Sequence, residues 1–221
     1  MTGRRALRVG VLALTGLLAG CSGTPSDSEL QGAADARPAG LAALEAFPLP
    51  ELTGWTVAAE RTIDACGSNT SDQMFDETHI EGYSCVAVRR TAYELTDAAD
   101  AGTRDAAAFT ALMQIQTAFA DLPSAFHPDD VPPESPAFAV NASPPNAGGA
   151  LLVDGRRVQM TGYLQSAEVA DYDILPIWHI NERVGSDSGE MRDALMARAD
   201  GGEFLVITVT LSYFSVQRDD A

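Results

Sequence analysis

Several stretches of the chain alternate apolar and polar residues, and this period of two predicts half-buried strands. The clearest stretch is residues 205–213, where Leu205, Ile207, Val209, Leu211 and Tyr213 form one face and Thr208, Thr210 and Ser212 lie on the other. Residues 55–63 show the same alternation, and residues 83–93 are rich in β-branched and aromatic side chains. We therefore expect strands over all three ranges. Strict alternation further favours antiparallel pairing, with one face of the sheet wetter than the other.

Two more regions carry strand signals. Asp154-Gly155 is a typical two-residue hairpin turn, and residues 150–153 and 156–164 form its expected arms. Apolar residues at alternate positions predict another strand over 172–180, with Pro176 marking an edge or a bulge.

Helices are predicted where apolar residues recur every three or four positions. The strongest candidate is 103–122, and shorter helices are expected over 41–47 and 187–199. Strands and helices that follow one another in this order indicate an α+β fold. We expect a twisted antiparallel sheet with helices packed mainly on one face.

The N-terminus has the organisation of a targeting segment. Arg4, Arg5 and Arg8 precede an uncharged apolar run from Val9 to Ala19, shorter than the roughly 20 residues that a spanning helix needs. The run ends in Leu18-Ala19-Gly20-Cys21, which resembles the lipobox of bacterial lipoproteins. The resemblance implies cleavage after residue 20 and diacylglycerol attached to the Cys21 thiol, so that the protein sits on the extracytoplasmic face of the cell membrane.

Composition suggests how the rest of the chain is organised. Residues 21–39 contain few large apolar side chains and are expected to form a flexible tether. Residues 40–221 are long enough for one α+β domain with a sizeable core. A proline-rich loop is expected at 123–149, either as a binding loop or as a strap across the surface.

Charge narrows the choice of partners. The formal net charge is −17, and every basic residue is an arginine. Such an acidic chain is not expected to bind nucleic acid or to use anionic lipid as a direct ligand. Cations and basic partners remain compatible with it.

Cys66 and Cys85 form an even pair once Cys21 is assigned to the lipid anchor. An exported protein meets an oxidising environment, which favours a disulfide between them. Zinc is the alternative, but two cysteines without a second Cys or His pair make a poor zinc signature.

One short segment is similar to hydrolase motifs. Residues 185–189 read Gly-Ser-Asp-Ser-Gly, but the central residue of a nucleophile elbow must be serine and here it is Asp187. Asp187 followed by Glu190 instead fits a helix N-cap with a capping box. No catalytic residue is assigned, and a catalytic Ser188 remains the alternative.

Weaker patterns indicate possible ligand or ion contacts. His79 lies among the acids Asp72, Asp76 and Glu77, whose oxygens suit a hard divalent cation, although a solvated acidic loop explains them as well. Arg89 and Arg156 sit on predicted strands, where each could bind an anion or form an ordinary salt bridge. The remaining candidate contact is the aromatic residue Trp178. No metal site and no cofactor is predicted.

These observations favour a membrane-anchored, non-catalytic lipoprotein that binds a small ligand or a partner protein at the cell envelope. A hydrolase of the envelope and an accessory subunit of an envelope complex are the alternatives.

Overall fold

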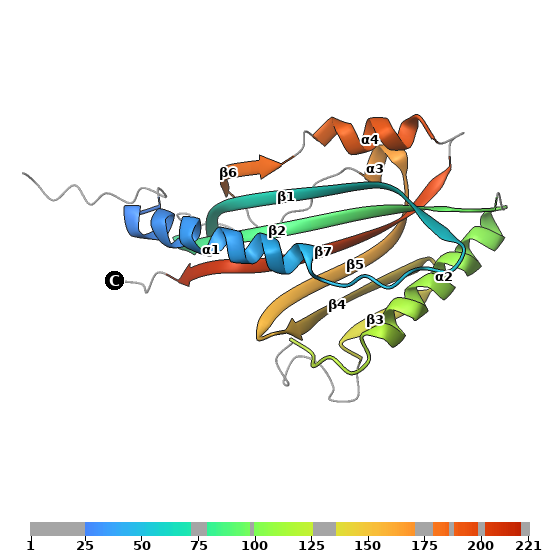
Figure 1. Cartoon of the computed structure of the whole chain (residues 1–221), viewed down its shortest axis with the longest axis horizontal. Coiled ribbons are helices and arrows are strands. Elements are labelled where there is room, and N and C mark those ends of the chain that lie inside the picture. Colours follow the sequence, from blue (N-terminus) through green and yellow to red (C-terminus); the bar gives the residue numbers. More distant parts are fainter. Residues whose placement is uncertain are drawn as a thin grey trace, which may run out of the picture.

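A seven-stranded antiparallel sheet forms the centre of the molecule (Figure 1). The computed structural model describes residues 25–71, 79–97, 100–125, 136–170, 179–185, 188–198 and 202–217. In sheet order the strands are β3 (Phe138–Ala142), β4 (Pro145–Val153), β5 (Arg156–Ser166), β7 (Glu203–Gln217), β2 (His79–Leu95), β1 (Trp55–Ser71) and β6 (His179–Gly185). Every neighbouring pair is antiparallel. The predicted α+β fold is confirmed.

Helices cover both faces of the sheet, and the two long ones share a face. These are α1 (Asp27–Glu45) and α2 (Ala101–Ala118), which pack in one cluster with Leu205 and Ile207 of β7. The short α3 (Ala167–Ala170) and α4 (Ser188–Met196) pack instead with the alternate residues Phe204 and Val206. Alternate residues of a strand point to opposite faces, so α1 and α2 lie on one side and α3 and α4 on the other.

Most of the predicted elements are confirmed, with adjusted ends. The β4–β5 turn holds Asp154 at φ 50° and Gly155 at φ 74°, as a type I′ hairpin turn requires. Strands β1 and β2 continue well beyond the predicted ranges 55–63 and 83–93. Of the strand expected over 172–180, only residues 179 and 180 lie in the described part of the chain, and they begin β6, which continues to residue 185.

The tether predicted over 21–39 is wrong from Asp27 onward, where α1 begins. Ser26 caps the helix in a reciprocal capping box with Glu29, which satisfies backbone N–H groups of the first turn. The residues that α1 buries include Ala33, Gly40 and Leu44. Two of these three are small, so the buried side of α1 escapes a search for large apolar residues.

Gly40 marks a close approach of α1 to the sheet. A Cβ atom added there would lie 2.5 Å from the Cβ and Cγ atoms of Tyr213. Gly32, two turns earlier, meets the ring of Phe214 in the same way, at 2.8 Å. Small residues thus set the distance between α1 and β7.

The Gly40→Ala variant should be destabilised by about 1–3 kcal/mol, because α1 must move away from β7 to fit the methyl group. Gly102 of α2 is the matched control, since a Cβ there would meet only Asp100 Oδ1, at 3.6 Å. Gly102→Ala should leave stability unchanged or raise it by up to about 1 kcal/mol. Urea unfolding of both variants checks this, and equal midpoints would contradict the close packing.

The proline-rich loop predicted at 123–149 is also wrong in part, because β3 and the first half of β4 fall within it. The prolines do not interrupt these strands, because β3 itself contains none and Pro145 is the first residue of β4. Residues 123–125 run beside β4 as well, since the N–H groups of Leu152 and Ala125 donate to the carbonyl oxygens of Pro123 and Ala150. Residues 126–135 lie outside the described part.

Within the described ranges, no helix has both the length and the apolar composition needed to cross a membrane.

Candidate functional site

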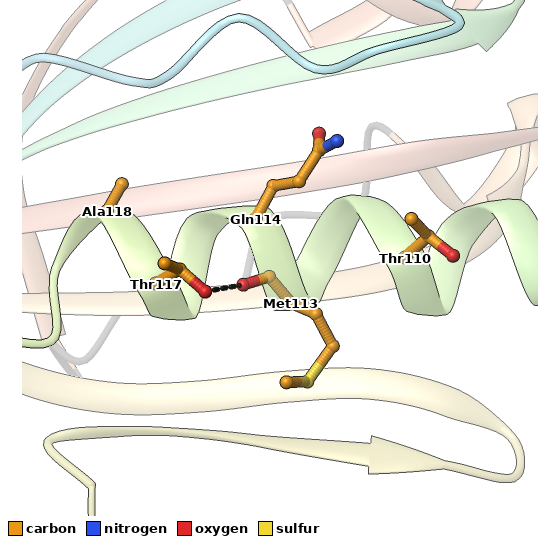
Figure 2. Close-up of a pocket in the computed structure, with 5 residues that line it drawn as sticks. All are labelled: Thr110, Met113, Gln114, Thr117 and Ala118. Carbon is orange, nitrogen blue, oxygen red and sulfur yellow. Dashed lines mark hydrogen bonds between the residues drawn. The ribbon is translucent and has the colours of Figure 1, made fainter.

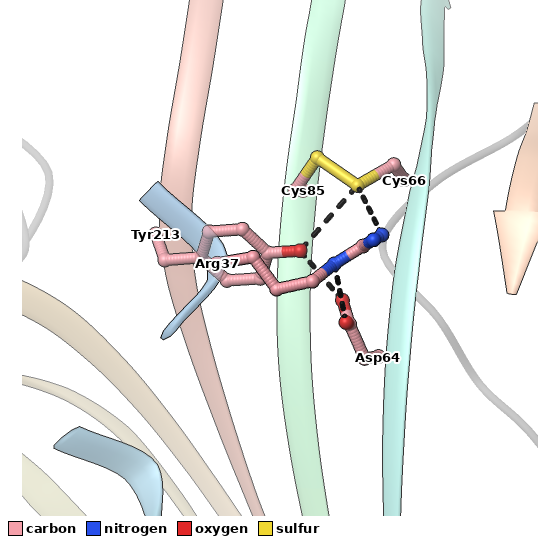
Figure 3. Close-up of a disulfide and its surroundings, with 5 residues drawn as sticks. All are labelled: Arg37, Asp64, Cys66, Cys85 and Tyr213. Atoms are coloured by element: carbon pink, nitrogen blue, oxygen red, sulfur yellow. Dashed lines mark hydrogen bonds and ion pairs between the residues drawn. A yellow bond between two sulfur atoms is a disulfide. The ribbon is translucent and has the colours of Figure 1, made fainter. Parts of the chain in front are cut away.

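A buried polar cluster lies beneath α1 and joins it to three strands (Figure 3). It consists of Arg37 from α1, Asp64 from β1, Tyr213 from β7 and the disulfide between Cys66 and Cys85. We call this group the α1 clamp. The predicted disulfide is confirmed, and it links residues directly opposite each other on β1 and β2. Both cysteines are fully buried.

Asp64 is the centre of the α1 clamp. Its Oδ2 atom lies 2.7 Å from Arg37 Nε, and its Oδ1 atom accepts a hydrogen bond of 2.5 Å from the Tyr213 hydroxyl. The sulfur of Cys66 lies 3.7 Å from an Arg37 guanidinium nitrogen and 3.4 Å from the Tyr213 oxygen. The buried carboxylate therefore has a charged partner and a neutral donor at the same time, as burial of a charge requires.

The chemistry available to the α1 clamp is limited. Burial first, and then the hydrogen bond to Asp64, raise the pKa of Tyr213 above its usual value. The phenol therefore stays neutral near pH 7 and acts as a hydrogen-bond donor. The two sulfur atoms are bonded to each other and supply no thiolate nucleophile. We interpret the cluster as a fastening for α1 and not as a catalytic centre.

Arg89 and Arg156, predicted as possible ligand contacts, both bind the main chain of the α1 segment. Arg89 donates to the carbonyl oxygens of Glu45 and Phe47, at 3.3 and 2.7 Å. Arg156 donates to the carbonyl oxygen of Ala39 at 3.1 Å. Of these three acceptors, only the Glu45 carbonyl belongs to the last turn of α1, where carbonyls lack partners within the helix and carry partial negative charge. In these hydrogen bonds the two guanidinium groups bind neither an anion nor an acidic side chain. They bind main-chain carbonyls and so hold the α1 segment against the sheet.

Arg90 follows Arg89 on β2 and points to the opposite face of the sheet. It is buried on the α3 and α4 side of the sheet, where it donates to Gln165 Oε1 at 3.4 Å.

A small groove lies between the end of α1 and the β4–β5 turn. Its volume is about 170 Å³, and Asp154 and Arg156 are its charged residues. The remaining lining is apolar and is formed by Ala43, Ala46, Phe47, Pro48, Val153, Val158 and Leu211. An apolar lining with few polar groups is the usual composition of a ligand site, although this groove is smaller than most.

The outer surface of α2 carries a wider and more open depression of about 450 Å³ (Figure 2). Its lining is uncharged and consists of Thr110, Met113, Gln114, Thr117 and Ala118. Both threonine hydroxyls donate to helix carbonyls four residues earlier, and Gln114 accepts a hydrogen bond from the Thr53 backbone. Met113 and Gln114 point to opposite sides of the helix. The depression therefore offers mainly apolar contact.

The other predicted contacts cannot be placed. Asp72, Asp76, Glu77 and Trp178 lie outside the described residues. His79 opens β2 opposite Ser71, and its side chain lies outside the described part. Among the side chains that the structure does describe, no three His, Cys, Asp or Glu residues gather as metal ligands would.

Three residues of the α1 clamp were not among the predicted site residues. Arg37 lay in the expected tether, and Asp64 and Tyr213 are 149 positions apart. No motif spacing connects residues so distant in sequence. The capping signal Ser26–Glu29 was available, however, and would have placed Arg37 on a helix.

Comparisons of the chain with protein-family models, curated proteins and solved structures gave no match.

Proposed function

We propose that this protein is an exported lipoprotein, anchored to the membrane through an acylated Cys21, whose folded domain is a non-catalytic binding module of the cell envelope. The observation that carries the proposal is the motif Leu18-Ala19-Gly20-Cys21 at the end of a short apolar run that follows three arginines. The buried Cys66–Cys85 disulfide supports it, because disulfides persist in oxidising compartments outside the cytoplasm.

A binding role is favoured over catalysis by what the polar groups already do. Asp64 and Tyr213 hold each other and Arg37, and Arg89 and Arg156 hold the main chain of the α1 segment. These groups are engaged in fastening one helix to the sheet. The groove beside Phe47, with apolar walls and charges only at Asp154 and Arg156, suits an apolar group with a polar end.

Replacing Cys21 by alanine tests the anchor. The wild-type chain should begin at residue 21, carry the mass of the acyl groups and remain in the membrane fraction of a bacterial host. Cys21→Ala should lose both the acyl mass and the cleavage after residue 20. Ser22→Ala is the matched control and should be processed normally. Identical masses for wild type and Cys21→Ala would contradict the anchor.

Native mass spectrometry of protein extracted gently from its own membranes tests the binding role. A reproducible mass beyond the acylated chain is expected. Ala46 lines the groove and Ala42 does not, although both are exposed on or next to α1. Ala46→Trp should remove the extra mass and Ala42→Trp should retain it. A ligand held equally by both variants would place the binding site elsewhere.

A further inference from the structure

The groove between the end of α1 and the β4–β5 turn has the size of a single side chain. Its volume is about 170 Å³, whereas sites for drug-sized molecules hold about 300–1,000 Å³. An apolar cavity of about 150 Å³ accepts one benzene molecule. The groove therefore has room for one phenyl ring or one branched aliphatic side chain, and not for a long acyl chain or a fused ring system.

The walls of this groove are apolar and are held in place before any ligand enters. Val158 and Leu211 line it from the sheet and are both buried. Phe47 lines it from the α1 side, and its ring lies 5.4 Å from that of Phe119. The Phe47 carbonyl oxygen accepts a hydrogen bond of 2.7 Å from Arg89. A site whose walls are already ordered loses little conformational freedom on binding.

Two opposite charges lie beside this apolar space, on either side of Gly155 in the β4–β5 turn. Asp154 and Arg156 are both exposed, and both line the groove. Within the described part of the chain, Asp154 forms no ion pair, with Arg156 or with any other residue. Arg156 donates one hydrogen bond to the Ala39 carbonyl oxygen, and a guanidinium group has five N–H donors. The groove thus offers an anionic group, a cationic group and an apolar space together.

This combination is complementary to a free amino acid with an apolar side chain. Such a molecule is a zwitterion near pH 7, with an ammonium and a carboxylate group on the carbon that bears the side chain. The ammonium group can donate to the Asp154 carboxylate, and the carboxylate can accept hydrogen bonds from the Arg156 guanidinium group. A fatty acid would place its carboxylate beside Asp154 as well, and a simple amine would place its charge beside Arg156. Only the zwitterion supplies a partner for both charges.

We propose that the groove binds a free amino acid with a side chain of the size of leucine or phenylalanine. Asp154 holds the ammonium group, Arg156 holds the carboxylate, and the side chain enters the space between Phe47, Val158 and Leu211. This assignment rests on the binding role proposed above and names the ligand class for that groove. Because both charged residues are exposed, the affinity should fall as the salt concentration is raised.

Equilibrium dialysis of the full-length acylated protein in detergent micelles measures this binding, with radiolabelled L-leucine and L-phenylalanine as probes. Both should bind, and unlabelled L-leucine should displace them. N-acetyl-leucine lacks the ammonium group and leucine amide lacks the carboxylate, so each should compete several-fold less well than leucine. Glycine has both charges but no side chain to bury, and it should compete least.

Asp154→Asn is the central variant, because it removes one charge and keeps the shape of the turn. Asparagine tolerates positive φ as aspartate does, and Asp154 has φ 50°. The variant should bind leucine several-fold more weakly and should lose its preference for leucine over N-acetyl-leucine. Asp193→Asn is the matched control, since Asp193 is an exposed acid on α4, on the other side of the sheet. It should bind leucine as the wild type does, and Ala46→Trp should abolish binding.

Equal competition by leucine, N-acetyl-leucine and leucine amide would overturn the proposal. The groove would then recognise only an apolar side chain, as expected for a segment of a partner protein. Absence of leucine binding would overturn it too, and native mass spectrometry separates that result from failure of the binding role. An extra mass that Ala46→Trp removes would leave the groove as the site of another ligand class, whereas no extra mass at all would contradict both proposals.

Discussion

Removing the disulfide by the double change Cys66→Ala and Cys85→Ala should lower the free energy of unfolding by about 3 kcal/mol. The bridge joins cysteines 19 positions apart in sequence and closes the β1–β2 hairpin. In the chain-entropy view it restricts the unfolded state more than the folded one, and a loop of this length accounts for roughly that free energy. Loss of two fully buried sulfur atoms adds a packing cost.

Urea unfolding, followed by circular dichroism, measures this effect on the oxidised protein, the reduced protein and the double variant. The reduced protein and the variant should have similar midpoints, both well below that of the oxidised protein. Because α1 covers the disulfide, reduction of the folded protein should be slow and should accelerate once urea unfolds it. A stability loss below about 1 kcal/mol would show that the bridge is dispensable.

The second large effect is expected at Asp64. Asp64→Ala should destabilise the protein by about 3 kcal/mol, because it leaves Arg37 and the Tyr213 hydroxyl without their carboxylate partner. The Arg37 side chain is 25% exposed and can regain some water, so the loss should lie at the lower end for a broken buried pair. Asp64→Asn keeps an acceptor for Tyr213 and should cost less than Asp64→Ala.

An exposed ion pair in the same protein serves as the control. Glu203 lies 3.6 Å from Arg104, and its side chain is 45% exposed. Glu203→Ala should therefore cost less than about 1 kcal/mol. Urea unfolding at pH 7 compares the three variants with wild type. If Asp64→Ala and Glu203→Ala are equally mild, then the α1 clamp does not fasten α1.

Much of the sheet could be predicted from local pattern. Alternation marked the core of β7, the Asp154-Gly155 turn located the β4–β5 hairpin, and the cysteine count paired Cys66 with Cys85. Each of these signals is contained in a short stretch of chain. A strand that is buried on one face shows the same alternation of apolar and polar residues wherever it lies in the sheet.

Two parts of the fold show no such local sequence pattern. Before Leu44, the buried side of α1 includes the small residues Ala33 and Gly40, and at Gly40 the absence of a side chain lets the helix pack closely on β7. Strands β3 and β4 lie in proline-rich sequence, where proline normally argues against a strand unless the strand is an edge or the proline opens it. Composition therefore indicated loops where tertiary contacts determine the structure.

The candidate site was the least predictable feature. Arg37, Asp64 and Tyr213 come from α1, β1 and β7 and meet only when the sheet is assembled. Sequence reasoning instead proposed Arg89 and Arg156 as anion contacts or ordinary salt-bridge partners, because an arginine on a strand has the same appearance whether it binds an anion, an acidic side chain or a main-chain carbonyl. Distinguishing these roles requires knowing where α1 lies on the sheet.

The position of β7 has a consequence for the way the chain becomes folded. Among the strands that the structure describes, β7 is the last in sequence, yet it sits in the middle of the sheet between β5 and β2. Until its residues are available, β3–β4–β5 and β6–β1–β2 are two separate partial sheets with no strand to join them. The seven-stranded sheet described above therefore cannot be completed before the last of these strands is available.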